Sequence, residues 1–156
     1  MSDRLILTPV ERKPAILDVI RGARDRIVLS LFRANDPDIF AELAAAVAHG
    51  VQVDVLVTSN VKGTKTKVAQ LWDSLKATGA RLHPYGDPVV KYHAKYLVVD
   101  DGPAIVASLN LTKKCLERTH DALVITDDPS SSIRSIGSLT RTVSACRFRP
   151  MSRRDW

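Results

Sequence analysis

Cysteines, aromatic residues and long apolar runs are all scarce in this sequence. Its two cysteines, Cys115 and Cys146, form no CxxC pair, which argues against both a disulfide framework and a zinc ribbon. Aromatic residues make up 5% of the chain, which disfavours a surface on which the bases of a single strand stack. No apolar run approaches the ~20 residues that span a bilayer, and the N-terminus lacks the apolar stretch of a signal peptide. We therefore expect a cytoplasmic protein without a transmembrane segment.

The length and the charge of the chain predict one folded domain followed by a basic tail. The 156 residues are 45% hydrophobic and 26% charged, which is the usual balance of a globular domain. Residues 1–133 hold 17 basic and 16 acidic side chains, whereas residues 134–156 hold six arginines and one aspartate. We expect a domain over residues 1–128 and a Ser/Arg-rich C-terminal helix or tail, partly disordered, over residues 129–156. Such a tail is usually solvated, and binding to phosphate or to a membrane is its alternative role.

The apolar pattern alternates between helices and strands. Runs of strand length predict strands at residues 27–32, 51–57, 81–84, 95–99, 104–107 and 122–126. Helical spacing predicts helices around residues 16–23, 36–50 and 68–79, and the apolar residues between 133 and 143 allow one more. The first helix opens either at Thr8, whose spacing to Glu11 fits a capping box, or at Pro14. This order predicts an α/β fold in which helices sandwich a mixed sheet.

The main group of chemically useful side chains lies on and after the predicted strand at 95–99. His93, Lys95 and Asp100 follow the pattern HxK(x)4D. Because side chains alternate between the two faces of a strand, His93 and Lys95 share one face and Asp100 has the opposite parity. We therefore expect Asp100 to be structural, either holding the turn at residues 101–103 or pairing with a neighbouring strand.

Two further polar residues, Ser108 and Asn110, follow the next predicted strand and share parity with each other. If strand 104–110 pairs with strand 93–99, they join His93 and Lys95 around one small anion. The lysine supplies positive charge and the asparagine an amide donor. A nucleophile with these two donors suits a phosphate better than a carbonyl substrate, so we expect a phosphodiester site.

The HxK(x)4D run followed by SxN resembles the phospholipase D superfamily, the proteins with the HKD motif. The IVLSLF run, the His-Gly-Val sequence before a valine-rich strand and the Thr-Gly-Ala turn before the third strand extend the likeness over roughly residues 10–128. The chain is most similar to one half of the bacterial phospholipase D and cardiolipin synthase-like proteins. The resemblance implies a metal-independent phosphodiesterase without a cofactor. It also implies that one histidine forms a covalent phosphohistidine while a second protonates the leaving group.

Two such motifs are needed for one site, and this chain has only one. His49, His83 and His120 lack a lysine two residues later. The resemblance therefore implies a twofold homodimer in which each subunit lends His93, Lys95 and Asn110 to a shared site.

The chain departs from the family pattern at two points. Ala107 stands where the family usually has glycine. The family also often carries, beyond the asparagine, an acidic residue that fixes the tautomer of a histidine. Asp121 is the candidate for that role and Glu117 a weaker one, while an aspartate that merely opens a strand is the alternative for Asp121.

Three functions remain open at this point. The first is a phospholipase D-type enzyme that hydrolyses or transfers a phospholipid phosphodiester, with peripheral association to the membrane. The second is a single-motif dimeric endonuclease acting on nucleic acid, which the near-neutral body and the scarce aromatic residues disfavour. The third is a non-catalytic or truncated half of a two-motif enzyme. A lysine-rich stretch at residues 62–67, before a predicted helix, is a further candidate for phosphate contact.

Overall fold

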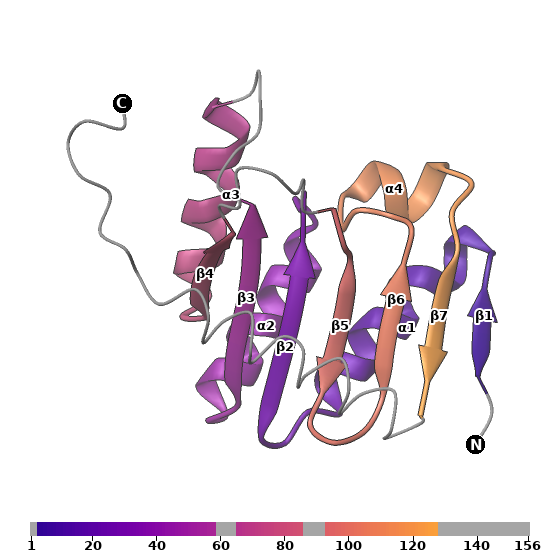
Figure 1. Ribbon diagram of the computed structural model, residues 1–156, viewed down its shortest axis with the longest axis horizontal. Coiled ribbons are helices and arrows are strands. Elements are labelled where there is room, and N and C mark those ends of the chain that lie inside the picture. The colour runs from indigo at the N-terminus through magenta and orange to yellow at the C-terminus, as the bar shows by residue number, and fades with distance from the viewer. Residues whose placement is uncertain (1–2, 59–64, 86–92, 128–156) are drawn as a thin grey trace.

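The computed structural model describes residues 3–58, 65–85 and 93–127, which form one sheet and four helices (Figure 1). The strands are β1 (Arg4–Ile6), β2 (Arg26–Leu31), β3 (Gln52–Thr58), β4 (Arg81–Tyr85), β5 (Tyr96–Val99), β6 (Ala104–Ala107) and β7 (Leu123–Thr126). Their order across the sheet is β1-β7-β6-β5-β2-β3-β4.

The sheet is mixed, as the element order predicts. β2, β3 and β4 run parallel and are joined through helices, because a parallel pair needs a crossover connection. The other half is antiparallel: β5 pairs with β2 and β6, and β7 pairs with β6 and β1. The predicted hairpin of β5 and β6 is confirmed, and so is the α/β class with a mixed sheet.

The helices pack side by side in one layer. They are α1 (Pro9–Arg21), α2 (Pro37–Ala48), α3 (Lys65–Ala77) and α4 (Lys113–Arg118). α1 contacts α2 and α4, α2 contacts α3, and Figure 1 shows α1 and α2 behind the strands. Their apolar faces meet that side of the sheet in a core that includes Ile16, Ile20, Ile39, Leu43, Leu75, Leu29, Val55, Leu97 and Ile105.

The helix starts differ in how they are capped. α1 begins at Pro9 with Thr8 as an extended N-cap residue whose side chain makes no capping bond, so the predicted capping box does not form. Pro14 lies inside the helix, which makes the alternative start there wrong. At α2 the side chain of the N-cap residue does form the cap, because the Asp36 carboxylate accepts the backbone N–H groups of Asp38 and Ile39 at 3.1 and 3.3 Å.

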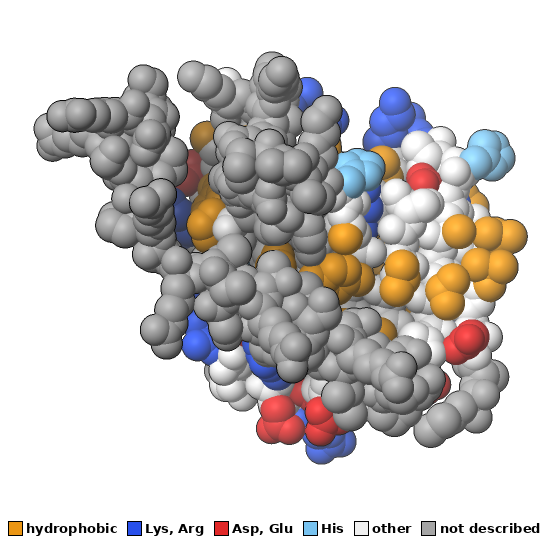
Figure 2. All heavy atoms as spheres, in the orientation of Figure 1, with side chains coloured by type: hydrophobic (Ala, Val, Ile, Leu, Met, Phe, Trp, Pro, Cys, Tyr) orange, Lys and Arg blue, Asp and Glu red, His pale blue; other side chains and the backbone are white. Residues whose placement is uncertain are grey.

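Several exposed apolar side chains lie on the face of the sheet away from α1 and α2. Leu5 and Val106 are 60% and 59% exposed, and both stand beside Val124 in the strand register. Figure 2 shows hydrophobic side chains gathered over β6, β7 and β1 on this face.

Two short elements, β1 and α4, are absent from the sequence-based prediction, and Lys95 precedes β5 instead of starting it. The predicted helix between 133 and 143 and the predicted tail at 129–156 lie outside the described residues, as do residues 62–64 of the lysine-rich stretch at 62–67. No helix within the described ranges is long and apolar enough to cross a membrane.

Candidate active site

The candidate site lies at one end of the β5–β6 hairpin. His93 and Lys95 precede β5, and Ser108 and Asn110 follow β6. Because the strands are antiparallel, the residues before the first and after the second meet at the same end. The backbone pairing continues there, since the N–H of Ala107 donates to the carbonyl of Lys95 at 3.0 Å. The hairpin thus brings four of the predicted site residues to one place.

The ammonium group of Lys95 is held directly against His93. Its Nζ lies 2.8 Å from Nδ1 and 3.0 Å from Nε2 of the ring, and it donates to the His93 carbonyl at 2.7 Å. A positive charge this close to the ring disfavours a second positive charge on the imidazole. The contact therefore favours a neutral imidazole, which is the form that can act as a nucleophile.

The surroundings of His93 also favour the neutral ring. The Phe32 ring packs edge-on against it with centroids 4.9 Å apart, and Arg33 lies 5.3 Å from the Phe32 centroid. Partial burial lowers the pKa of His93 below 6.5, and the positive charges of Lys95 and Arg33 lower it further. Sequence patterns gave no sign that Phe32 and Arg33 lie near the motif, because both follow β2 and are distant from the motif in sequence.

Lys95 is a buried cation with only 7% of its surface exposed. Burial lowers its pKa, and the negative charge of Asp121 opposes that effect. A buried ammonium group near a carboxylate has few waters to give up when an anion arrives. Lys95 is therefore suited to hold a phosphoryl oxygen next to the His93 ring.

Asp121 is tied to Ser108 rather than standing free. Its carboxylate accepts the Ser108 hydroxyl at 2.6 Å and also the Thr119 hydroxyl. Burial alone would raise the pKa of Asp121, but these hydrogen bonds, with the charges of Arg12 and Lys95, bring it below 3.8. Within the described part of the chain the carboxylate thus accepts from Ser108 and Thr119, and no histidine is among its hydrogen-bond partners there. Glu117 lies exposed on α4.

Asn110 carries a buried polar atom that nothing else in the described residues satisfies. Its Oδ1 makes no hydrogen bond. Buried polar atoms are rarely left unpaired, and such an exception at a site points to a missing ligand. A 180° turn of the amide would present its N–H groups at the same position, where they could donate to a phosphoryl oxygen.

Asp100 lies at the opposite end of β5 from His93. Its carboxylate accepts the backbone N–H groups of Arg24, Asp25 and Arg26 at 2.9, 2.9 and 2.7 Å. Burial would raise its pKa, but these three donors lower it below 3.8. The motif aspartate therefore joins the hairpin to the start of β2, and its carboxylate takes no part in the group around the histidine.

Arg12 is a second residue that the sequence reasoning missed. It is 1% exposed, and its two terminal nitrogens donate to four carbonyls, those of Leu7, Cys115, Thr119 and Asp121, at 2.7 to 3.0 Å. It thereby fixes the segment that carries Asp121. The sequence does hold a signal for it, because Arg12 occupies the apolar face of α1, one turn before Ile16.

Ser30 fixes the backbone between the two motif residues. This buried serine on β2 donates its hydroxyl to the carbonyl of Ala94 at 2.9 Å. No three His, Cys, Asp or Glu side chains gather into a possible metal site in the ranges that the structure describes.

A family model described as the PLD-like domain of cardiolipin synthase matches residues 16–141. Comparison with curated protein sequences finds no match. Among solved structures, NucT from Helicobacter pylori is similar with a TM-score of 0.76 at 17% identity, over 93% of this chain and 97% of that one.

Two further solved structures share the fold. Nuc from Salmonella typhimurium, a phospholipase D family member, has a TM-score of 0.74 at 22% identity, over 89% of this chain and 91% of that one. Phosphatidylserine synthase from Haemophilus influenzae has a TM-score of 0.71 at 15% identity, over 93% of this chain and 38% of that one. At these identities the likenesses show the fold alone. The family model covers most of the chain, and the chain therefore belongs to the PLD-like family.

Proposed function

We propose that this protein is a metal-independent phosphodiesterase of the phospholipase D type, in which His93 forms a covalent phosphohistidine. The observation that carries the proposal is the contact of the buried Lys95 ammonium with the His93 ring, within 3.0 Å of both nitrogens. It combines a neutral nucleophile and a fixed positive charge at one point. Phosphoryl transfer needs these two groups most.

In the first step a ring nitrogen of His93 attacks phosphorus. A nitrogen–phosphorus bond forms, and the phosphorus–oxygen bond to the leaving alcohol breaks. The leaving oxygen takes a proton from a second histidine, and Lys95 and Asn110 hold the phosphoryl oxygens while charge builds on them.

In the second step water, or an alcohol in a transfer reaction, attacks the phosphohistidine. The second histidine, now neutral, accepts the proton of the attacking group. The nitrogen–phosphorus bond breaks, which releases the phosphoryl product and restores both histidines to their starting states. The two steps divide one difficult displacement into two easier ones.

We infer that the second histidine comes from another copy of the chain. In-line displacement places nucleophile and acid on opposite sides of phosphorus, and one imidazole cannot occupy both. Among the other histidines, His83 is bound to Asp54 at 2.9 Å on β4, and His49 lies at the end of α2. His120 is exposed, precedes Asp121 and has no lysine two residues later to hold a phosphate beside it. A homodimer sharing one site around a twofold axis supplies the missing group.

We infer a phospholipid as the substrate, with nucleic acid as the second candidate. Residues 1–133 are close to neutral, with 17 basic and 16 acidic side chains, whereas a polynucleotide surface is usually strongly basic. The corresponding location is the cytoplasm, with peripheral association to the membrane that carries the lipid.

Activity of the purified protein on bis(p-nitrophenyl) phosphate, phosphatidylcholine and plasmid DNA, with EDTA present, tests this function. We expect turnover that survives EDTA and vanishes in His93→Asn. His49→Asn is the matched control, because His49 is exposed and distant from the motif. Substantial turnover in His93→Asn would remove His93 from the mechanism, and loss of activity in EDTA would contradict the metal-free route. An inactive wild-type protein would favour a non-catalytic half.

A further inference from the structure

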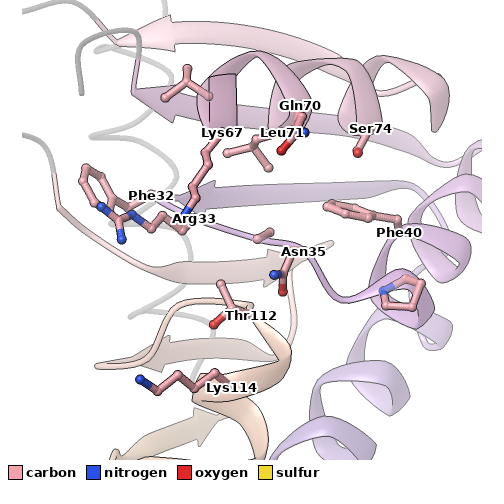
Figure 3. A pocket seen from close by; sticks show the side chains of 13 residues that line it. Phe32, Arg33, Asn35, Phe40, Lys67, Gln70, Leu71, Ser74, Thr112 and Lys114 are labelled. Carbon is pink, nitrogen blue, oxygen red and sulfur yellow. The ribbon is translucent and has the colours of Figure 1, made fainter. Parts of the chain in front are cut away.

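A pocket of about 680 Å³ opens beside the candidate site (Figure 3). Four segments line it: the residues that follow β2, the start of α2, the first three turns of α3 and the start of α4. Its volume lies in the usual range for a small-molecule site. Nothing in the mechanism above makes use of it.

The pocket shares one wall residue with the surroundings of the histidine. Phe32, which packs edge-on against the His93 ring at 4.9 Å, is also a wall of the pocket, and so is its neighbour Arg33. A group attached to a phosphorus atom at His93 therefore has the pocket as its adjoining space.

The charged side chains that line the pocket are all positive. Arg33, Lys67 and Lys114 line it, and no aspartate or glutamate is among its described lining residues. Figure 3 shows Arg33 and Lys67 toward the end where Phe32 lies. This end suits the anionic part of a ligand.

The rest of the lining combines six apolar residues with four polar ones, Asn35, Gln70, Ser74 and Thr112. Pro37 and Phe40 of α2 and Val68 and Leu71 of α3 contribute to it, and Figure 3 shows Phe40 toward the end away from Phe32. A polynucleotide would carry further phosphates away from the site and would need cations along its path. The apolar side chains of α2 and α3, beyond Arg33 and Lys67, suit an alkyl or acyl chain instead.

We propose that this pocket holds the hydrocarbon chain of an amphiphilic phosphodiester whose phosphorus lies at His93. The inference rests on the proposed phosphodiesterase function and assigns the hydrocarbon part of its substrate to a place in the structure. Arg33 and Lys67 lie near the phosphate, and Phe40 and Leu71 contact the chain.

Three diesters with the same leaving group test the assignment: the p-nitrophenyl esters of methyl phosphate, octyl phosphate and thymidine 5′-phosphate. Each releases p-nitrophenolate, so differences in kcat/KM report only on the group that stays on phosphorus. We expect the octyl ester to exceed the methyl ester by about tenfold or more in kcat/KM, because every buried CH₂ group contributes favourably.

Filling the pocket should remove that preference selectively. Ser74 lines the pocket on α3, so Ser74→Phe should bring the octyl ester down to the rate of the methyl ester and leave the methyl ester unchanged. Ala69→Phe adds the same ring to an exposed position of α3 outside the lining and should keep the preference.

The remaining outcomes test the chain-binding role of the pocket and the phosphodiesterase function separately. Equal rates for the octyl and methyl esters, or an octyl preference that survives Ser74→Phe, would overturn the chain-binding role. A preference for the thymidine ester that Ser74→Phe removes would assign the pocket to a nucleoside. If no ester is hydrolysed, the proposed function fails. Calorimetry with octyl phosphate then shows whether the pocket still binds an alkyl phosphate. Binding lost in Ser74→Phe would support the pocket assignment, and no binding would refute it.

Discussion

At the scale of single residues, the pair formed by Lys95 and His93 provides both an unprotonated nucleophile and a positive charge that attracts phosphate. The ammonium group lowers the pKa of the imidazole, adding to the effect of burial, and so keeps the nucleophile unprotonated. The same charge attracts the oxygens of a phosphate to within reach of the ring. A lysine two residues after the histidine achieves both only because its side chain is buried and folds back onto the ring and carbonyl of His93.

Replacing Lys95 with methionine should separate these two effects. The removal of the positive charge should raise the pKa of His93 toward 6.5, because the charge is one of the causes that lower it. The acidic limb of the kcat/KM profile, where the nucleophile becomes protonated, should shift to higher pH in parallel. We also expect kcat/KM at neutral pH to fall by about 10²- to 10³-fold, as when one preorganised donor is lost.

The His93 pKa can be measured directly by NMR titration of the ring protons, assigned by comparison with His93→Asn. Lys76→Met, on the exposed face of α3, is the matched control and should change neither the pKa nor the rate. An unchanged His93 pKa in Lys95→Met would show that the two groups are not coupled in solution.

The predictability of the site differs from residue to residue. His93, Lys95, Ser108 and Asn110 could be placed together because strand alternation and one hairpin determine their positions. The hydrogen-bond partners of Asp121 could not be predicted, because the position of Asp121 depends on α4. This six-residue helix is too short to leave a clear periodic pattern. Phe32 and Ser30 contact the motif only through the pairing of β2 with β5, which sequence spacing does not reveal.

At the scale of elements, the β5–β6 hairpin holds the site at one end and is anchored at the other. Asp100 has a φ of +50°, a left-handed conformation that only glycine, asparagine and aspartate adopt readily. This turn aims its carboxylate at three backbone N–H groups at the start of β2. Strand parity predicted that Asp100 turns away from His93, whereas its hydrogen bonds to β2 required knowledge of the sheet order.

Asp100→Asn should therefore cost stability. Asparagine keeps the backbone conformation and removes the charge and one acceptor. We expect a loss of about 1.5–3 kcal/mol in the free energy of unfolding at neutral pH, the scale of a hydrogen bond to a charged group. Because the folded-state pKa of Asp100 is lowered, its contribution is complete above the ordinary value of 3.8 and is lost as the pH falls through the folded value.

Thermal unfolding of both proteins between pH 3 and 7 measures this effect. The difference in Tm should be largest near neutrality and shrink on acidification. Asp101→Asn changes the next, exposed residue in the same way and should leave Tm nearly unchanged. If Asp100→Asn kept the wild-type Tm but lost all turnover, the carboxylate would have a chemical role instead.

The remaining elements show where sequence patterns suffice. Long runs with clear periods predicted α2, β2 and β3, and α2 (Pro37–Ala48) falls within the predicted range of residues 36–50. β1 is three residues long, too short for a pattern of its own, and it is held in place by pairing with β7. The start of α1 was ambiguous because Pro9 and Pro14 both suit a first turn, and only the packed helix shows that Pro14 is tolerated inside.

At the scale of the whole molecule, the proposed mechanism requires more than one chain. Each copy supplies one His93, one Lys95 and one Asn110, while displacement at phosphorus requires groups on both of its sides. A twofold axis beside His93 would place two imidazoles and two ammonium groups around one phosphate. It would also bring Asp121 of one copy near the histidine of the other, where its low pKa keeps it ionised as a partner for a charged ring.

Mixed dimers provide the test of this arrangement. When wild-type and His93→Asn chains are unfolded together and refolded at equal amounts, half of the dimers should contain one histidine, a quarter two and a quarter none, by random pairing about a twofold axis. Since a dimer with a single histidine lacks either the nucleophile or the acid, total activity should fall to about a quarter of that of an all-wild-type sample at the same total chain concentration. Independent sites would leave about half. His49→Asn chains mixed in the same way should leave activity unchanged, and dilution should reduce specific activity as subunits separate. Sedimentation that shows a fully active monomer would contradict the shared site.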